Sequence, residues 1–189
     1  SAVIVQSIMG PLRQRERQIR ALFQTTQAVS SSLELEHVLG SLAQEALHAL
    51  QARSVIIRLL ERDGDTLHPA AHAGAGDAPD QPIQRKRSPL LAQALAGELV
   101  VTTQAQALQE FPQVDLPGGA RSLLLVPIQG QARPLGVLIV ASAQAPAELG
   151  ADQRRFVQAI AATGSVAIEH ALAHQALQEA EKQRTQFVH

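Results

Sequence analysis

The stretch from residue 151 to residue 189 contains no proline and only one glycine, Gly164. Because proline and glycine are the residues least favourable inside a helix, an uninterrupted run of this kind favours one long helix. At about 1.5 Å per residue it would extend roughly 58 Å, more than a single compact domain of this size can cover. We therefore predict a C-terminal helix whose first part belongs to a domain and whose last part reaches toward another part of the protein.

The beginning of the chain shows a similar pattern. Residues 12–30 are mostly strong helix formers, with arginines between the apolar positions. The apolar positions follow a spacing that is partly heptad-like, at Leu12, Ile19, Leu22, Phe23 and Val29. A domain that is entered and left through long helices is typical of a relay between two other parts of a protein.

Composition narrows the possible functions. With 189 residues, of which 46% are hydrophobic, the chain can form a real core. The formal net charge of -1 argues against nucleic acid as a partner, since nucleic-acid-binding domains usually carry a basic surplus. The absence of cysteine excludes disulfides, cysteine-ligated zinc, thiol nucleophiles and thioether-linked chromophores. With 2% aromatic residues a haem would lack its usual stacking partners, so we expect no cofactor.

The sequence also bears on where the protein lies in the cell. It contains no run of about 20 apolar residues and no signal peptide, so we expect this fragment to be cytoplasmic. Residues 2–10 are apolar, however, and arginines occur at positions 13, 15, 17 and 20. Two interpretations stay open: the end of an upstream segment that tethers the protein to the inner membrane, with its cytoplasmic basic flank, or an amphipathic linker helix.

Hydrophobic periodicity predicts the order of helices and strands. Helices are predicted over 33–50, over 88–96 with Ser88 as N-cap and Pro89 at the first position, and over 104–111. Strands are predicted over 54–60, 66–73, 99–102, 121–128 and 135–142, with a surface loop over 74–89. Because strands succeed one another in hairpins at both ends of this region, we predict an α+β fold with an antiparallel sheet and helices on both faces.

Four segments carry a resemblance to a known family. They are residues 32–39 in the second helix, 120–128 and 135–140 in two late strands, and 149–153 before the final helix. In this order and spacing they resemble the GAF domain, a small-ligand sensory fold related to PAS. The resemblance covers roughly residues 24–174. It implies an N-terminal linker helix over 1–31, a sensory domain over 32–174 and a C-terminal coiled-coil linker over 175–189.

The last residues bear on the output of the domain. Residues 181–189 resemble the segment that leads into the dimerisation and phosphoacceptor helix of sensor histidine kinases, where a Phe-Val or Phe-Leu pair precedes the phosphorylated histidine. On this pattern His189 falls too early to be the acceptor. The resemblance implies a two-component signal-transduction protein with a kinase domain downstream in the same polypeptide. A cyclase or a transcription-factor domain stays open as another output.

The resemblance to the GAF domain also implies a place for a small, unidentified ligand, between the sheet and the helices predicted over 89–95 and 104–111. Bilin attachment is excluded because it needs cysteine, and the pattern of cyclic-nucleotide-binding members is absent. No catalytic constellation can be assembled from the sequence, so we expect no enzymatic activity. The candidate walls are Leu91, Leu95 and Phe111, and the candidate polar contacts are Arg58, His72, Arg121 and Ser122. The alternative is that these residues are ordinary core and surface residues.

The final helix carries a seam of small residues that would let two copies approach closely. We therefore predict a parallel homodimer through a bundle of four helices, which would relay a signal by changing its packing. His170 and His174 share a helix face, but no third metal ligand is evident, so we expect no metal site. A ligand-free dimerising spacer is the alternative to a ligand-binding relay. The candidate interface residues are Ile19, Leu22, Val29, Gly164, Ala167, Ala171, His174 and Leu177.

Overall fold

The computed structural model describes residue 15 and residues 33–111 and 116–187. The chain divides into two compact units, one of residues 35–170 and one of residues 1–34 together with residues 171–189. The sheet and the two cores around it belong to the 35–170 unit. The predicted N-terminal helix, with the interface candidates Ile19, Leu22 and Val29, lies outside the described residues.

A six-stranded sheet with the order β3-β2-β1-β6-β5-β4 forms the centre of this unit. Every neighbouring pair of strands is antiparallel, which confirms the predicted α+β class. The two central strands, β1 and β6, join the two halves of the sheet. The strands are β1 (Ala52–Leu60), β2 (Thr66–Gly74), β3 (Ile83–Gln84), β4 (Val100–Thr103), β5 (Ser122–Gln129) and β6 (Pro134–Ser142).

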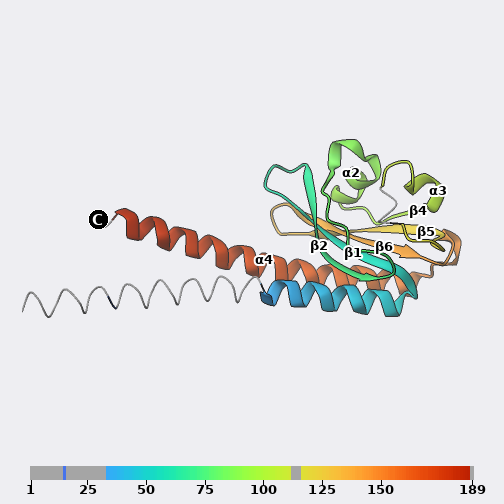
Figure 1. Ribbon diagram of the computed structural model, residues 1–189, viewed down its shortest axis with the longest axis horizontal. Helices are drawn as coiled ribbons and strands as arrows, with labels where there is room; N and C mark the ends of the chain where they lie inside the picture. Colours follow the sequence, from blue (N-terminus) through green and yellow to red (C-terminus); the bar gives the residue numbers. More distant parts are fainter. Residues whose placement is uncertain (1–14, 16–32, 112–115, 188–189) are drawn as a thin grey trace, which may run out of the picture. The chain divides into compact units, whose positions relative to one another are not determined.

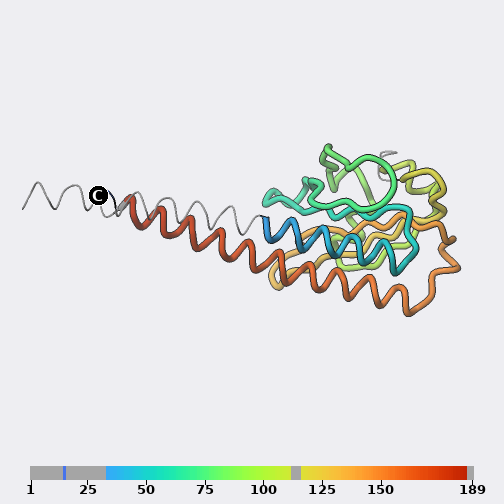
Figure 2. Tube along the Cα trace, turned by 60° about the horizontal axis from the view of Figure 1, so that its bottom comes forward, coloured from blue at the N-terminus to red at the C-terminus, as the bar shows by residue number. Residues whose placement is uncertain are grey.

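Helices cover both faces of the sheet (Figure 1). One face carries η1 (Arg85–Arg87), α2 (Pro89–Leu95) and α3 (Gln104–Ala107). Under the other face, the helix over residues 33–49 and the first part of α4 (Ala151–Phe187) lie side by side, as two views agree (Figure 2). The short helix η3 (Pro146–Glu148) precedes α4.

Alternation along the strands produces two cores, one on each face of the sheet. In β1, Val55 and Ile57 belong to the core beneath the sheet, with the 33–49 helix and α4. Ile56 and Leu60 point the other way, into the core under α2 and α3. Both faces are therefore filled, which is why the strands read as continuous apolar runs in the sequence.

The structure differs from the predicted elements in the excursion between β2 and β4. Ile83 and Gln84 form a short sixth strand, and the basic triplet Arg85–Arg87 forms η1, where the sequence predicted a loop. Two residues give too little periodicity to predict a strand. The helix α3 ends at Ala107, earlier than predicted. Ser88 is confirmed as the N-cap of α2, because its side chain accepts a hydrogen bond from the Leu91 amide.

The turn between β1 and β2 is closed by Asp63. Its carboxylate accepts hydrogen bonds from the Thr66 hydroxyl at 2.6 Å and from the backbone amides of Thr66 and Asp65 at 2.9 Å. These bonds, that of the Thr66 hydroxyl first, lower the pKa of Asp63 from 3.8 to about 2. The turn fixes the register of the hairpin that carries Arg58 and His72.

The lowered pKa of Asp63 predicts an acid-dependent contribution to stability. A carboxylate with a lower pKa in the folded state stabilises the fold above its unfolded pKa, and this is lost as the pH falls toward its folded pKa. We expect a carboxyl NMR titration of Asp63 with a midpoint near pH 2. Asp63→Asn should lose less stability between about pH 4 and pH 2 than the unaltered chain. A midpoint near 3.8 would contradict this assignment.

By length and composition alone, residues Ala151–Gln186 of α4 could cross a membrane, although 28% of the most apolar 18-residue window is buried. Within the 35–170 unit, Val157, Ile160 and Ile168 pack into the core beneath the sheet. This part of α4 is therefore an integral element of the globular domain.

Candidate functional site

Arg58 is a fully buried charged residue on the face of the sheet that carries α2 and α3. It lies between Ile56 and Leu60, which both enter that core. Its Nη1 donates a hydrogen bond of 2.8 Å to the backbone carbonyl of Gln81, in the segment between β2 and β3. Burying a guanidinium costs free energy unless polar groups surround it. This part of the core is therefore adapted to hold a charged side chain.

His72 lies on the same face of the sheet, on the neighbouring strand. It pairs with Ile56 of β1. Arg58, two residues further along β1, pairs with Pro69, and the register of the two strands shifts between Ile57 and Arg58. The Nε2 atom of His72 is buried and has no hydrogen-bond partner within the part of the chain that the structure describes. The side chain borders a concavity of about 310 Å³, whose other lining residues are Pro69, Ala70, Ala71, Ala78 and Pro79.

The segment between β2 and β3 thus covers both polar candidates. Gln81 accepts from Arg58, and Ala78 and Pro79 close the concavity beside His72. The structure therefore brings together two of the four predicted polar contacts, Arg58 and His72. An unsatisfied imidazole nitrogen beside an open volume can accept or donate one hydrogen bond to a small bound molecule.

The predicted apolar walls have a different role. Leu91, Leu95 and Phe111 are all buried, and they pack with strand residues in one continuous core under α2 and α3. None of them lines the concavity beside His72. In this structure they fill the space between the sheet and α2 that the sequence assigned to a ligand. This outcome agrees with the alternative that they are ordinary core residues.

The structure places the other two polar candidates away from Arg58 and His72. Arg121 has a side chain that is 59% exposed and forms an ion pair of 3.3 Å with Glu148. Ser122 alternates with Leu123, so it faces the α4 side of the sheet, and its hydroxyl donates to the carbonyl of Gln144 at 2.7 Å. Neither Arg121 nor Ser122 lines the concavity beside His72, and their role in ligand binding stays a prediction.

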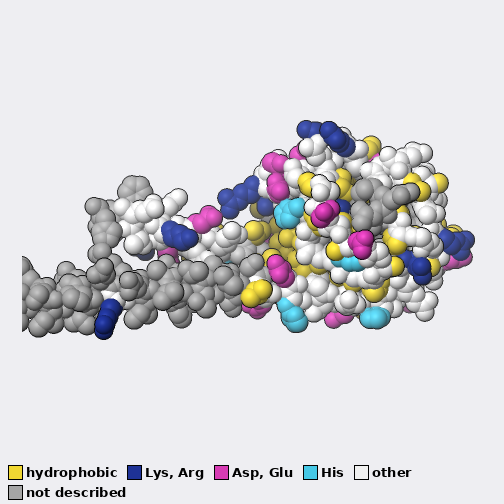
Figure 3. Space-filling model, viewed as in Figure 1, with side chains coloured by type: hydrophobic (Ala, Val, Ile, Leu, Met, Phe, Trp, Pro, Cys, Tyr) yellow, Lys and Arg dark blue, Asp and Glu magenta, His cyan; other side chains and the backbone are white. Residues whose placement is uncertain are grey.

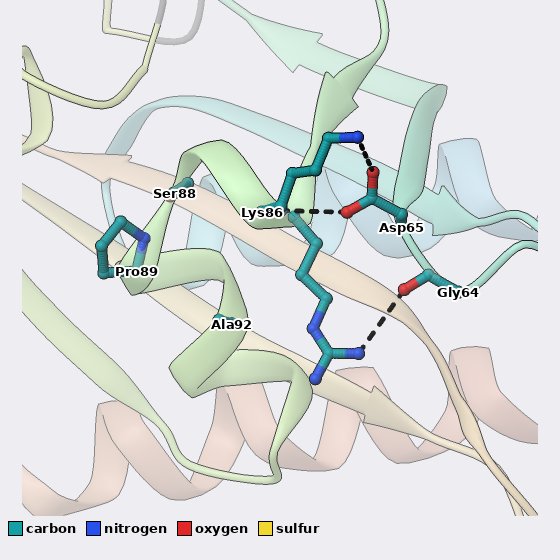
Figure 4. Close-up of a pocket in the computed structure, with 7 residues that line it drawn as sticks. Gly64, Asp65, Lys86, Ser88, Pro89 and Ala92 are labelled. Carbon is teal, nitrogen blue, oxygen red and sulfur yellow. Dashed lines mark hydrogen bonds and ion pairs between the residues drawn. The ribbon is translucent and has the colours of Figure 1, made fainter.

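A second concavity, of about 360 Å³, lies between α2 and the turn of the first hairpin (Figure 4). The basic side chains at its edge are already engaged. Lys86 lies 3.6 Å from Asp65, and Arg85 donates to the carbonyl of Gly64 at 3.5 Å. These contacts tie η1 to the hairpin, which is a structural role. On the face drawn in Figure 3, basic and acidic side chains are interspersed over the domain.

No group of three or more His, Cys, Asp or Glu side chains is placed to hold a metal ion among residues 33–111 and 116–187. His174 lies 3.4 Å from the side-chain nitrogen of Gln178 on the same helix. The concavity along the 33–49 helix brings Glu36, His37, Glu45 and His72 to one surface, with a volume of about 570 Å³. It is an open groove of polar residues at the edge of the sheet.

The outer face of α4 exposes apolar side chains among the polar residues Asp152, Arg155 and His170. Phe156 is 44% exposed and Val166 is 71% exposed, the largest exposed fraction among the large hydrophobic residues described. Ala159, Ala162 and Thr163 are exposed on the same face. In a helix with 3.6 residues per turn, these positions surround Val166, opposite the buried residues Val157 and Gly164.

Gly164 does not lie on this outer face. It is buried, and a Cβ added to it would lie 3.5 Å from Leu42 of the 33–49 helix in the same chain. In this structure the small size of Gly164 serves packing within one chain, and its place at a dimer interface stays a prediction. Ala167 is half-buried, at the edge between the two faces.

The remaining interface candidates lie beyond residue 170, in the other unit. Leu177 is 64% exposed, and Ala171 and His174 are half-buried. The residues that the sequence analysis missed are Phe156 and Val166. The signal that could have found them is the alternating spacing of three and four along Phe156, Ala159, Thr163, Val166 and His170.

Comparison with known proteins identifies the family of this domain. The family model described as the GAF domain matches residues 34–170. The chain belongs to the GAF domain family. GAF domains are typically sensory or regulatory domains that bind ligands.

Solved GAF structures share the fold at low sequence identity. The GAF domain from an Acinetobacter phosphoenolpyruvate-protein phosphotransferase has a TM-score of 0.61 at 22% identity, over 80% of this chain and 95% of that chain. The second GAF domain of DevS from Mycobacterium smegmatis has a TM-score of 0.58 at 17% identity, over 76% and 99%. A GAF domain/HD domain protein from Geobacter sulfurreducens has a TM-score of 0.61 at 14% identity, over 76% and 97%. No curated protein matches the chain.

Proposed function

We propose that this GAF domain is a non-catalytic regulatory module that acts as a homodimer and passes a conformational signal along α4. In the proposal the recipient is a histidine kinase domain downstream in the same polypeptide. The observation that carries the proposal is the exposed apolar outer face of α4, centred on Val166. A helix that already packs a core on one side and exposes Phe156 and Val166 on the other offers these apolar side chains to a second partner.

The sequence of α4 favours a second copy of this chain as that partner. The spacing of three and four that begins at Phe156 continues through Ala173, Leu177 and Ala180. Such a repeat supports two parallel helices, because each position then meets its own counterpart across the pair. A heterologous partner would need no such repeat.

The link to a kinase rests on the resemblance of residues 181–189 to the segment that precedes a phosphoacceptor helix. The helix α4 continues without a break to Phe187, so a tilt or rotation of its first half would be felt along its length. A few kcal/mol of differential stabilisation is enough to shift a two-state population from minority to majority. We further propose that the module works in the cytoplasm, tethered by a membrane segment upstream of residue 12. A cyclase or transcription-factor output is the alternative.

A small ligand beside His72 is the second part of the proposal. The buried and unpartnered Nε2 of His72 supports it, together with the concavity at that point. The ligand would carry a group that forms a hydrogen bond with this imidazole nitrogen. The filled core under α2 supports the alternative, a dimerising spacer without a ligand.

Native mass spectrometry of the purified chain tests both parts at once. We expect a species with twice the 20.1 kDa of one chain. Additional mass that disappears in His72→Phe would support a ligand at this site. A dimer without additional mass would support the ligand-free spacer. A species of 20.1 kDa alone, at all concentrations used, would contradict the homodimer.

A further inference from the structure

The turn between β5 and β6 holds α4 at two points. The hydroxyl of Ser165 donates a hydrogen bond to the carbonyl of Gln129. One helical turn further along, a carboxylate oxygen of Glu169 accepts a hydrogen bond of 2.7 Å from the amide of Gln131. Both contacts fall in the last part of α4 that belongs to the 35–170 unit.

The same turn also reaches the layer on the opposite face of the sheet. The side-chain nitrogen of Gln129 donates a hydrogen bond of 3.3 Å to the carbonyl of Leu95, the last residue of α2. Gln129 therefore touches α2 through its side chain and α4 through its backbone. With these two hydrogen bonds a single residue joins the helical layers on the two faces of the sheet.

The turn packs closely against Glu169 of α4. A Cβ added to Gly130 would lie 2.6 Å from the carboxylate of Glu169 and 2.8 Å from the carbonyl of Arg133. The amide of Gly130 also donates to the Arg133 carbonyl at 2.9 Å, which closes the turn on itself. A displacement of the turn would therefore displace Glu169 or break its hydrogen bond.

We propose that this turn is a latch that couples the end of α2 to α4, through Gln129, Ser165 and Glu169. The proposal rests on the proposed function, in which α4 carries the signal, and it names the route by which a change under α2 reaches that helix. When α2 moves, the carbonyl of Leu95 displaces the side chain of Gln129 through their hydrogen bond. The backbone of Gln129 then moves relative to the hydroxyl of Ser165. A polar link of this kind has two discrete states, made or broken, as a switching element requires.

Hydrogen exchange measured by mass spectrometry on the full chain tests the latch. The probe is Ser165→Ala, which removes the contact to α4 without touching α2. We expect amide exchange to rise about 3- to 10-fold in residues 160–170 and also in residues 92–97, at the end of α2, as the loss of one hydrogen bond would give. Gln129→Ala should produce the same two changes from the other end of the link.

Thr185→Ala is the matched control. Its hydroxyl donates to the carbonyl of Glu181 in its own helix, at 2.7 Å, and Thr185 lies outside the spacing of the proposed dimer interface. We expect it to leave exchange in residues 92–97 unchanged. Faster exchange confined to residues 160–170 in Ser165→Ala would overturn the latch, and so would an equal effect of Thr185→Ala on α2.

Repeating the measurement in a Val166→Arg background separates this proposal from the homodimer. Val166 has 71% of its surface exposed. If Ser165→Ala still raises exchange in residues 92–97 in the monomeric variant, the latch is supported independently of the dimer. Coupling that is present in the dimer and absent in the monomer would overturn the latch as a property of one chain.

Discussion

We expect Gly136→Ala to lower the free energy of unfolding by roughly 3 kcal/mol or more. Gly136 lies in β6 opposite Leu59, at the centre of the sheet. A Cβ at this position would collide with the backbone carbonyl of Arg58 and lie 3.1 Å from the Cα of Leu59. Because these are backbone atoms of the neighbouring strand, the clash can be relieved only by separating β1 from β6.

Chemical denaturation followed by circular dichroism measures this effect. Gly40→Ala is the control, since a Cβ at Gly40, inside the 33–49 helix, would meet no atom within 4 Å. We expect Gly40→Ala to raise the free energy of unfolding by about 0.5 to 1 kcal/mol, because alanine favours helix over glycine. An unchanged midpoint for Gly136→Ala would mean that the close approach of β1 and β6 is not a feature of the folded protein.

The second large effect is expected for Val166→Arg, which should weaken the dimer by about 100-fold or more, equivalent to roughly 3 kcal/mol. The substitution places a charge at the centre of the apolar outer face, and two-fold symmetry would bring two such charges together. The fold should be retained, because Val166 is 71% exposed in the single chain. Sedimentation equilibrium gives the dissociation constant, and circular dichroism reports the fold.

Gln109→Arg is the matched control for Val166→Arg. Gln109 is exposed and comes just after α3, on the opposite face of the sheet from α4. Arginine at this position adds the same charge away from the proposed interface, so we expect the dissociation constant to stay within about twofold. Equal dissociation constants for the two variants would remove the outer face of α4 as the interface.

Much of the fold could be predicted from the sequence because the strands are buried on both faces. Residues 121–128 and 135–142 are nearly continuous apolar runs, and the structure places β5 and β6 there with boundaries shifted by at most one residue. The N-cap signal of Ser88 before Pro89 was equally specific, since the hydroxyl, the proline and the helix start all agree. Arg58 and His72 stay predicted ligand contacts, given by the resemblance to GAF domains; both are polar residues inside largely apolar strands.

The surroundings of the candidate site and interface residues were harder to predict, because they depend on which face of the sheet or of α4 each side chain lies on. Ser122 and Arg121 lie at the start of a strand, where a shift of one residue exchanges the two faces of the sheet, so their sequence position did not define their surroundings. In α4 the small residue Gly164 allows close packing against another helix, whether that helix belongs to the same chain or to a second copy. The sequence cannot distinguish packing on Leu42 of the same chain from packing on a second copy. The spacing of three and four places Phe156 and Val166 on one face of α4, but the sequence alone does not show that this face is the exposed one.

The central claim is that two copies of this GAF domain pair in parallel through the outer face of α4. Because the chain has no cysteine, Val166→Cys or Ala159→Cys introduces a single thiol, and disulfide formation under mild oxidation reports the distance between equivalent positions. Only a parallel pairing brings both positions close to their counterparts. We expect rapid cross-linking of both variants at low protein concentration, and none of Gln109→Cys. Cross-linking of Val166→Cys and Ala159→Cys that is no faster than that of Gln109→Cys would contradict the account.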